Sequence, residues 1–416
     1  MKKKIKKICS LFLINLLLLA VGCGKVPDSR ETETSEGQAE EYVIGVAVFD
    51  PDNTEMNMFM NYYKNYLEEG FPVKFYFSEA LSTAEDENNF VRAMKKEGAN
   101  GIISFYGLDL PGTVEVCQEE KLYYVLGSGT VSEESFNAVK DNPWFLGTVG
   151  PKSEEEYQAG VNMAQTFVDK DSNNFLLMTG GSSSGNFMHS SRSKGVLETL
   201  AYGKNFRISD MDELVQTSEN QKIENEDGTA SITLCPGYME SEEGLKNLEC
   251  ALAEGNYDTV LCTYGINTVL NQMNSKEKEQ GTNIKIGVID CFSEENTEAI
   301  REEDIQGNSQ IDYVEGKYAS MVGPAFAMLY NAFTDHKEAN SNDREALRLY
   351  QGFWEAKNKE EYLELFDYTQ GIYENAYDCD DLMSVIKVYN QDTTPEKLKK
   401  LAEAYKVEDI EKRIQK

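Results

Sequence analysis

Residues with the potential for covalent chemistry are few and scattered along this chain. The 416 residues include only two histidines, His189 and His336, and neither stands within a spacing of residues that would hold a metal ion. The loop Gly180–Gly185 precedes a predicted helix, but it lacks the Gly-Lys-Ser/Thr ending of a phosphate-binding loop. Its serines have no evident triad partners. We therefore expect no enzyme activity, no cofactor and no metal site.

Polar and aromatic residues stand instead at the ends of predicted strands. Asp290 and Tyr264 directly follow apolar stretches, Phe49 ends another, and Tyr106 follows a fourth. In parallel sheets the carboxyl ends of the strands face the ligand crevice, where a carboxylate accepts hydrogen bonds and a ring covers a flat apolar surface. The alternatives are that the aromatic rings pack beneath a hinge and that Asp290 caps a helix beginning near Ser293. The chemistry indicated is recognition of a small molecule.

The elements that would position these residues alternate between strand and helix. Short apolar runs predict strands, and runs with helical spacing separate them, which is typical of parallel sheets with right-handed crossovers. The pattern restarts at Gly150, where Ser153 and Glu156 form a predicted capping box. A further helix is expected to begin at Thr394–Pro395. The predicted strands cover residues 42–49, 73–77, 101–105, 122–126, 144–149, 175–178, 206–214, 231–234, 259–263 and 284–289.

The N-terminus has the order of a secretory signal. Lysines between Lys2 and Lys7 precede an apolar run over Ile8–Ala20, which is shorter than the roughly 18 residues of a membrane span. The sequence Ala20-Val21-Gly22-Cys23 resembles the bacterial lipobox, and that resemblance implies cleavage and lipidation at Cys23. The following residues, through Glu41, are polar and predict a flexible tether.

The net charge of the chain limits the classes of partner that the protein could bind. The net charge is −32, and removal of the five lysines of the signal would take it to −37. Such a charge disfavours nucleic acid and anionic lipid surfaces as partners. We interpret it as a solvated acidic surface.

Several motifs between residues 42 and 335 occur together in an informative order. They are Trp144–Gly160 (WFLGTVGPKSEEEYQAG), Leu176–Gly195 (LLMTGGSSSGNFMHSSRSKG), Ile286–Asp290 (IGVID) and Gln310–Gly316 (QIDYVEG). In this order they resemble the type I periplasmic binding protein family, the sugar-binding partners of ABC transporters. The resemblance implies two doubly wound α/β lobes joined by a hinge. Residues 344–416 lie outside it and predict a helical extension.

The resemblance also implies a set of ligand-binding positions. Arg192, Asp290 and Gln310 match family positions that bind a sugar, and Asn53 falls near another such position. The chain departs from the pattern where Gly127-Ser128 replaces an Asp-Arg pair, where Tyr264-Gly265 replaces an Asn-Asp step, and where Glu55-Met56 replaces aromatic residues. Together with the strand-end rings, the expected ligand-binding residues are Phe49, Asn53, Tyr106, Arg192, Tyr264, Asp290 and Gln310.

The organisation expected from the sequence is therefore an α/β protein of two doubly wound parallel-sheet lobes with a C-terminal extension. The expected segments are a signal peptide (1–22), a tether (23–41), lobe 1 (42–150 and 311–343), lobe 2 (151–310) and a helical extension (344–416).

The expected function is capture of a small polar solute, a sugar or a related molecule, for an ABC permease. The protein would be a monomer held by lipid on the extracytoplasmic face of the cell membrane. Two alternatives stay open: a nucleoside or other aromatic solute as ligand, and a sensing module for a membrane receptor kinase.

Overall fold

The computed structural model describes residues 41–170, 172–184, 187–342, 344–370 and 376–414. The predicted signal peptide, Cys23 and the tether up to residue 40 lie outside the described residues. The remainder, Glu41–Lys416, is a single compact unit. Among the described helices, none combines the length and the apolar character needed to cross a membrane.

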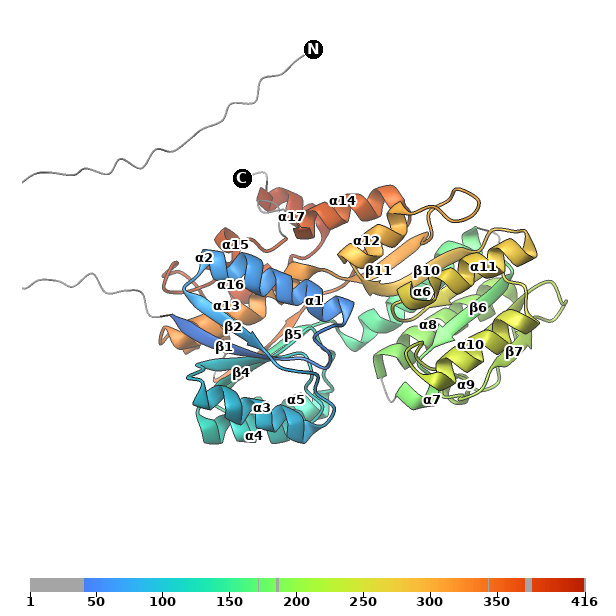
Figure 1. Cartoon of the computed structure of the whole chain (residues 1–416). Coiled ribbons are helices and arrows are strands. Elements are labelled where there is room, and N and C mark those ends of the chain that lie inside the picture. The colour runs from blue at the N-terminus through green and yellow to red at the C-terminus, as the bar shows by residue number, and fades with distance from the viewer. Residues whose placement is uncertain (1–40, 171, 185–186, 343, 371–375, 415–416) are drawn as a thin grey trace, which may run out of the picture. The chain divides into compact units, whose positions relative to one another are not determined.

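Two seven-stranded sheets organise this unit, and we call each sheet with its helices a lobe (Figure 1). The first sheet has the strand order β12-β13-β5-β4-β3-β1-β2 and is parallel except for the pairing of β12 with β13. Its strands are β1 (Tyr42–Ala47), β2 (Val73–Phe77), β3 (Gly101–Ser104), β4 (Tyr123–Gly127), β5 (Phe145–Gly150), β12 (Ser341–Asn342) and β13 (Glu345–Tyr350).

The second sheet has the order β14-β11-β10-β9-β6-β8-β7, with a parallel centre and an antiparallel strand at each edge. Its central strands are buried on both faces, which explains their continuous apolar sequences. The strands are β6 (Asn174–Thr179), β7 (Gln221–Glu224), β8 (Ser231–Pro236), β9 (Thr259–Cys262), β10 (Lys285–Cys291), β11 (Tyr313–Lys317) and β14 (Trp354–Ala356).

Helices cover both faces of the sheets, as the alternation of strand and helix predicts. In Figure 1, α3 and α4 lie on one face of the first sheet, and α1 and α13 lie on the other. The first-lobe helices are α1 (Thr54–Asn61), which continues as a π-helix (Tyr62–Leu67) and α2 (Glu68–Gly70), α3 (Ala84–Lys96), α4 (Leu110–Glu120), α5 (Glu133–Val139) and α13 (Gly323–Phe333). The second-lobe helices are α6 (Ser153–Asp169), α7 (Gly181–Ser184), α8 (Phe187–Lys204), α9 (Met211–Val215), α10 (Glu242–Glu254), α11 (Leu270–Gln280) and α12 (Glu294–Arg301).

Three local predictions are wrong. Residues 206–214 form no strand; Asp210 instead caps the short helix α9 by accepting from the Glu213 amide. The loop expected over residues 216–230 contains β7. The capping box of Ser153 and Glu156 is absent, because Glu156 is turned toward an arginine inside the protein.

The predicted boundary between the lobes at residue 310 is also wrong. Strand β11 pairs with β10 in the second sheet, with Gly316 opposite Asp290, so the chain crosses between lobes after Lys317. Helix α13 then packs against β4 and β5 of the first sheet. Gly316 permits this pairing, since a Cβ there would lie 2.0 Å from the Asp290 carbonyl oxygen.

The C-terminal extension is not purely helical. Strand β13 joins the first sheet beside β5, and β14 joins the second beside β11, so the chain crosses between the lobes once more. We call residues 357–416 the tail. The tail contains α14 (Lys359–Gln370), α15 (Cys379–Met383), α16 (Pro395–Glu403), whose N-cap is Thr394 as predicted, and α17 (Val407–Ile414).

The tail contacts both lobes. The Tyr62 hydroxyl of the first lobe donates to the Tyr377 carbonyl oxygen at 2.6 Å. In the second lobe Phe292 stacks on Tyr362, with ring centroids 4.9 Å apart. Trp354 of β14 donates from its indole nitrogen to the Tyr405 carbonyl oxygen at 2.9 Å. One hydrophobic core therefore contains residues of both sheets and of the tail.

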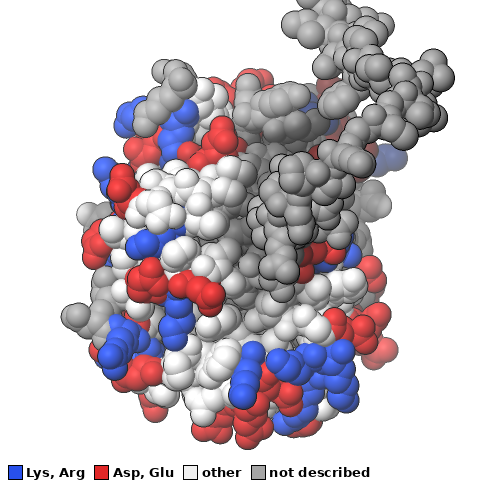
Figure 2. Space-filling view, turned by 90° about the vertical axis from the view of Figure 1, so that its left-hand side faces the viewer, with Lys and Arg blue, Asp and Glu red and all other residues white. Residues whose placement is uncertain are grey.

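The acidic composition is spread over the described surface. Figure 2 shows acidic and basic side chains lying side by side on the face that it presents. Exposed pairs such as Arg92–Glu85 and Lys140–Glu345 illustrate the mixing. This arrangement agrees with the interpretation of the charge as a solvated surface.

Helices α6 and α8 of the second lobe pack closely together, and two glycines permit this contact. A Cβ on Gly160 of α6 would lie 2.0 Å from the Arg192 carbonyl oxygen. A Cβ on Gly195 of α8 would lie 2.2 Å from the Tyr157 carbonyl oxygen. The glycine three residues after Arg192 is thus needed for packing.

We expect Gly195→Ala to destabilise the protein by about 1–3 kcal/mol, because the added methyl group meets backbone that cannot move aside. Urea unfolding of the full chain measures the effect. Gly203→Ala is the matched control in the same helix, since its methyl group would meet only side-chain carbons of Val168. Equal losses from the two variants would contradict the packing argument.

Candidate functional site

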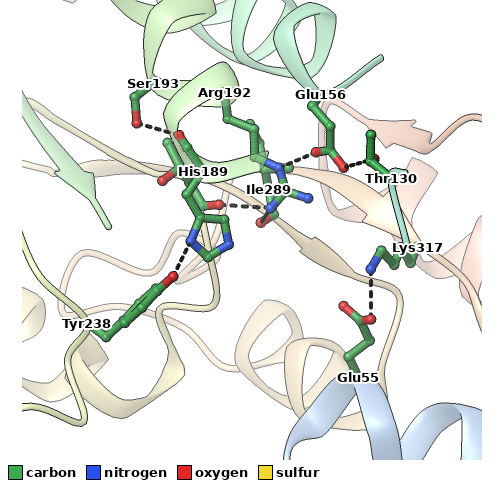
Figure 3. A network of polar contacts seen from close by, with 10 residues as sticks. Glu55, Thr130, Glu156, His189, Arg192, Ser193, Tyr238, Ile289 and Lys317 are labelled. Atoms are coloured by element: carbon green, nitrogen blue, oxygen red, sulfur yellow. Dashed lines mark hydrogen bonds and ion pairs between the residues drawn. The ribbon is translucent and has the colours of Figure 1, made fainter. Parts of the chain in front are cut away.

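Polar side chains from both lobes meet where the strands of the second sheet end. Lys317, the last residue of β11, forms an ion pair with Glu55 in the first turn of α1, with Nζ and Oε1 2.8 Å apart (Figure 3). The lysine side chain is 7% exposed and the glutamate 21%, so the pair is largely shielded from solvent. Ser128, after β4, donates to the same Glu55 oxygen at 3.4 Å. This pair joins the lobes at the edge where a ligand crevice is expected.

Arg192 is buried, and two of its three guanidinium nitrogens are bonded to groups within the protein. Its Nε donates to Glu156 Oε2 at 2.6 Å, and its Nη1 donates to the carbonyl oxygens of Thr263 and Ile289 at 2.9 and 3.3 Å. Thr130 of the first lobe donates to the other Glu156 oxygen at 3.4 Å. Because the guanidinium binds the ends of two neighbouring strands, it fixes helix α8 on the sheet.

Three aromatic side chains, His189, Tyr238 and Tyr264, lie together at the same edge of the second sheet, and we call them the aromatic group. The Tyr238 hydroxyl lies 2.8 Å from His189 Nδ1, and the Tyr264 ring packs against both, with centroids 5.3 and 5.8 Å away. The Tyr264 hydroxyl is held by the Gly237 carbonyl oxygen at 2.7 Å. Burial, and then the charges of Arg192 and Lys317, hold the pKa of His189 well below its usual value. The imidazole is therefore neutral at pH 7.

Asp290, near the end of β10, has mainly neutral hydrogen-bond donors around it. Its Oδ2 accepts from the Asn296 side-chain amide at 2.7 Å, and Asn296 is held in turn by Asn267. Burial raises the pKa of Asp290 to about 6; the bond from Asn296 opposes the rise and the charge of Glu55 adds to it. On one side stands Gly265, where a Cβ would lie 3.2 Å from Oδ2. Asp290 is half-buried, and none of the ion pairs among the described residues includes it.

The structure brings together three of the residues expected from the sequence: Arg192, Tyr264 and Asp290. Tyr264 matches the packing alternative in part, because its ring is buried and its hydroxyl is bonded. Asp290 does not cap the following helix; Ser293 does, by accepting from the Asn296 amide. Arg192 has a structural role in the site, since its partners are a glutamate and two main-chain carbonyl oxygens.

The other expected residues have different positions and partners. Gln310 precedes β11, at the edge of the sheet where the strands begin, and its side chain donates to Glu302 at 3.1 Å. The prediction that Gln310 lies in the ligand crevice is therefore wrong. Asn53 caps helix α1 by accepting from the Glu55 amide. Phe49 and Tyr106 follow β1 and β3 of the first lobe, and Phe49 is 40% exposed.

Sequence reasoning missed four members of the site: Glu55, Glu156, His189 and Lys317. Lys317 could have been found from the strand sequence YVEGK, which ends in a lysine opposite the end of β10. Glu156 was identified only as a possible cap. Glu55 and His189 carry no local signal, since their partners are at least 49 residues away in sequence.

We expect Asp290→Asn to stabilise the protein at pH 7.5 by an amount on the order of 1–3 kcal/mol. The folded-state pKa of about 6 exceeds the ordinary value of 3.8, so ionisation of Asp290 costs stability as the pH rises from 4 to 6, and asparagine avoids that cost. Urea unfolding at several pH values measures the gain, which should grow over that interval and stay constant above it. A less stable variant at pH 7.5 would refute this account of Asp290.

Among the described residues no group of three or more His, Cys, Asp or Glu side chains could hold a metal ion. The site thus consists of hydrogen-bonding groups, ion pairs and aromatic rings. These are the features of a small-molecule binding site.

Comparison with known proteins identifies the fold. No family model and no curated protein matches the sequence. A galactofuranose-binding protein matches in structure with a TM-score of 0.56 at 13% identity, over 80% of this chain and 99% of that one. A D-allose-bound solute-binding protein of an ABC transporter from Actinobacillus succinogenes 130z gives 0.56 at 11% identity, over 78% and 100%.

A third similar structure is the arabinose-binding component of an ABC transporter from Shewanella sp. ANA-3, bound to L-arabinofuranose. Its TM-score is 0.54 at 13% identity, over 79% of this chain and 95% of that one. At such identities the likeness establishes the fold. The chain has the two-lobed α/β fold of the periplasmic sugar-binding proteins of ABC transporters, as its sequence motifs predict.

Proposed function

We propose that this protein is an extracytoplasmic solute-binding lipoprotein that captures a small polar molecule between its lobes and presents it to an ABC permease. The observation that carries the proposal is the meeting of the two lobes at Glu55 and Lys317, beside Asp290 and the aromatic group. A solute bound there would contact both lobes. Lobe closure around it would report occupancy to a membrane partner.

The chemistry of the site supports binding without catalysis. His189 is neutral and hydrogen-bonded to a tyrosine, and the arginine and lysine are each paired with a glutamate. The described residues of the site offer no paired nucleophile and base. Structures of the same fold bind arabinofuranose and allose, which supports a polyhydroxylated solute as the ligand class.

An aromatic solute, such as a nucleoside, is the second candidate. The group His189, Tyr238 and Tyr264 favours it, because three rings within 6 Å of one another offer an apolar edge beside the polar groups. A sugar ring also packs on such a surface, so the ligand panel must include both classes.

We expect the cognate solute to raise the melting temperature of the full chain, since binding to the folded state alone adds about 3 kcal/mol at a hundredfold excess over Kd. A thermal-shift panel of sugars, nucleosides and amino acids measures it. Asp290→Ala should reduce the shift, and Gln310→Ala, at the other edge of the sheet, should leave it unchanged. The proposal fails if no member of a broad panel shifts the transition.

The lipid anchor is part of the proposal and has its own test. We expect the full chain produced in bacteria to incorporate labelled fatty acid and to sediment with membranes, and Cys23→Ser to do neither. Cys9→Ser is the matched control within the same signal and should keep both properties. The absence of label on the unsubstituted chain would exclude lipidation at this residue.

A further inference from the structure

The ion pairs of the site leave one charge uncompensated. Arg192 is paired with Glu156 at 2.6 Å, and Lys317 is paired with Glu55 at 2.8 Å. Both cations are at most 7% exposed, and each is held by a glutamate carboxylate. Three carboxylates thus face two cations, and the remaining negative charge lies on Asp290.

Asp290 has no cation of its own among the described residues. Its partners are the amide of Asn296 and the thiol of Cys291, which are neutral donors. Glu55 adds a second negative charge nearby, and its effect on Asp290 is larger than that of Arg192. An ionised carboxylate that is partly buried without a cation is unfavourable, so it favours a ligand that brings one.

A glycine lies directly beside the Asp290 carboxylate. Gly265 follows Tyr264 at the end of β9, and the atoms nearest to a Cβ placed there would be the three atoms of the Asp290 carboxylate, at 3.2 to 3.6 Å. A side chain at position 265 would therefore contact the Asp290 carboxylate. Glycine leaves this half-buried carboxylate without that contact, next to Tyr264 in the sequence.

Resting on the proposed solute-binding function, we infer that the ligand carries a protonated amine, which pairs with the Asp290 carboxylate while the Tyr264 side of the site holds a ring. An amino sugar has this chemistry. The cation would restore the charge balance of the site, and a charge-assisted bond to Asp290 would replace a neutral one.

The test compares probes that differ only in the amine. Glucosamine, galactosamine and mannosamine are titrated calorimetrically at pH 7 into the full chain, each against its neutral parent sugar and its N-acetyl derivative. We expect at least one amine to bind about tenfold tighter than both neutral partners. In Asp290→Asn that ratio should fall to about one, because the isosteric amide cannot pair with a cation.

Glu302→Gln is the control, since it removes one negative charge at the other edge of the sheet and should keep the tenfold ratio. Gly265→Ala places a methyl group against the Asp290 carboxylate and should weaken the amines more than the neutral sugars. Equal or tighter binding of the neutral sugars would overturn the amine inference and leave solute capture intact. An undiminished ratio in Asp290→Asn would also overturn it, and the absence of binding by every probe would count against both proposals.

Discussion

The buried guanidinium of Arg192 is the interaction on which the second lobe depends. Removing an arginine and a glutamate from water costs several kcal/mol for each charge, and only a close pair with further hydrogen bonds offsets it. Here the Nε–Glu156 bond and two strand-end carbonyl oxygens supply those contacts. They require α6 and α8 to approach closely, which the glycines at 160 and 195 allow. Arg192 therefore takes part in the packing of α6 against α8, holds the ends of β9 and β10, and contributes to the charge balance of the site.

Much of the fold was predictable because parallel strands buried on both faces leave a strong sequence signal. The runs at Tyr42–Ala47 and Lys285–Cys291 are nearly continuous in apolar residues, and helices with clear caps separate such runs. The edge strands β7 and β14 have no continuous apolar run, so the sequence does not predict them. Strand β11 was assigned to the wrong lobe, because its partner is decided by register with β10 and not by its own composition.

The site was harder to predict for a related reason. Strand ends identify Asp290 and Tyr264, since position along a strand is a local property. Pairing is not local: Glu55 and Lys317 are 262 residues apart, and Arg192 meets Glu156 across a helix interface. Family-like position also proved an incomplete guide, because Arg192 serves the protein interior and Gln310 lies at the far edge of its sheet. What a side chain can offer a ligand depends on what already neutralises it.

The tail has a mechanical consequence. It is joined to the first lobe through Tyr62 and to the second through Phe292 and Trp354. Trp354 also stacks on Tyr318, with ring centroids 3.9 Å apart, where the chain passes from one lobe to the other. Because the tail is bonded to both lobes, any rotation of one lobe against the other has to bend the tail or break one of these contacts.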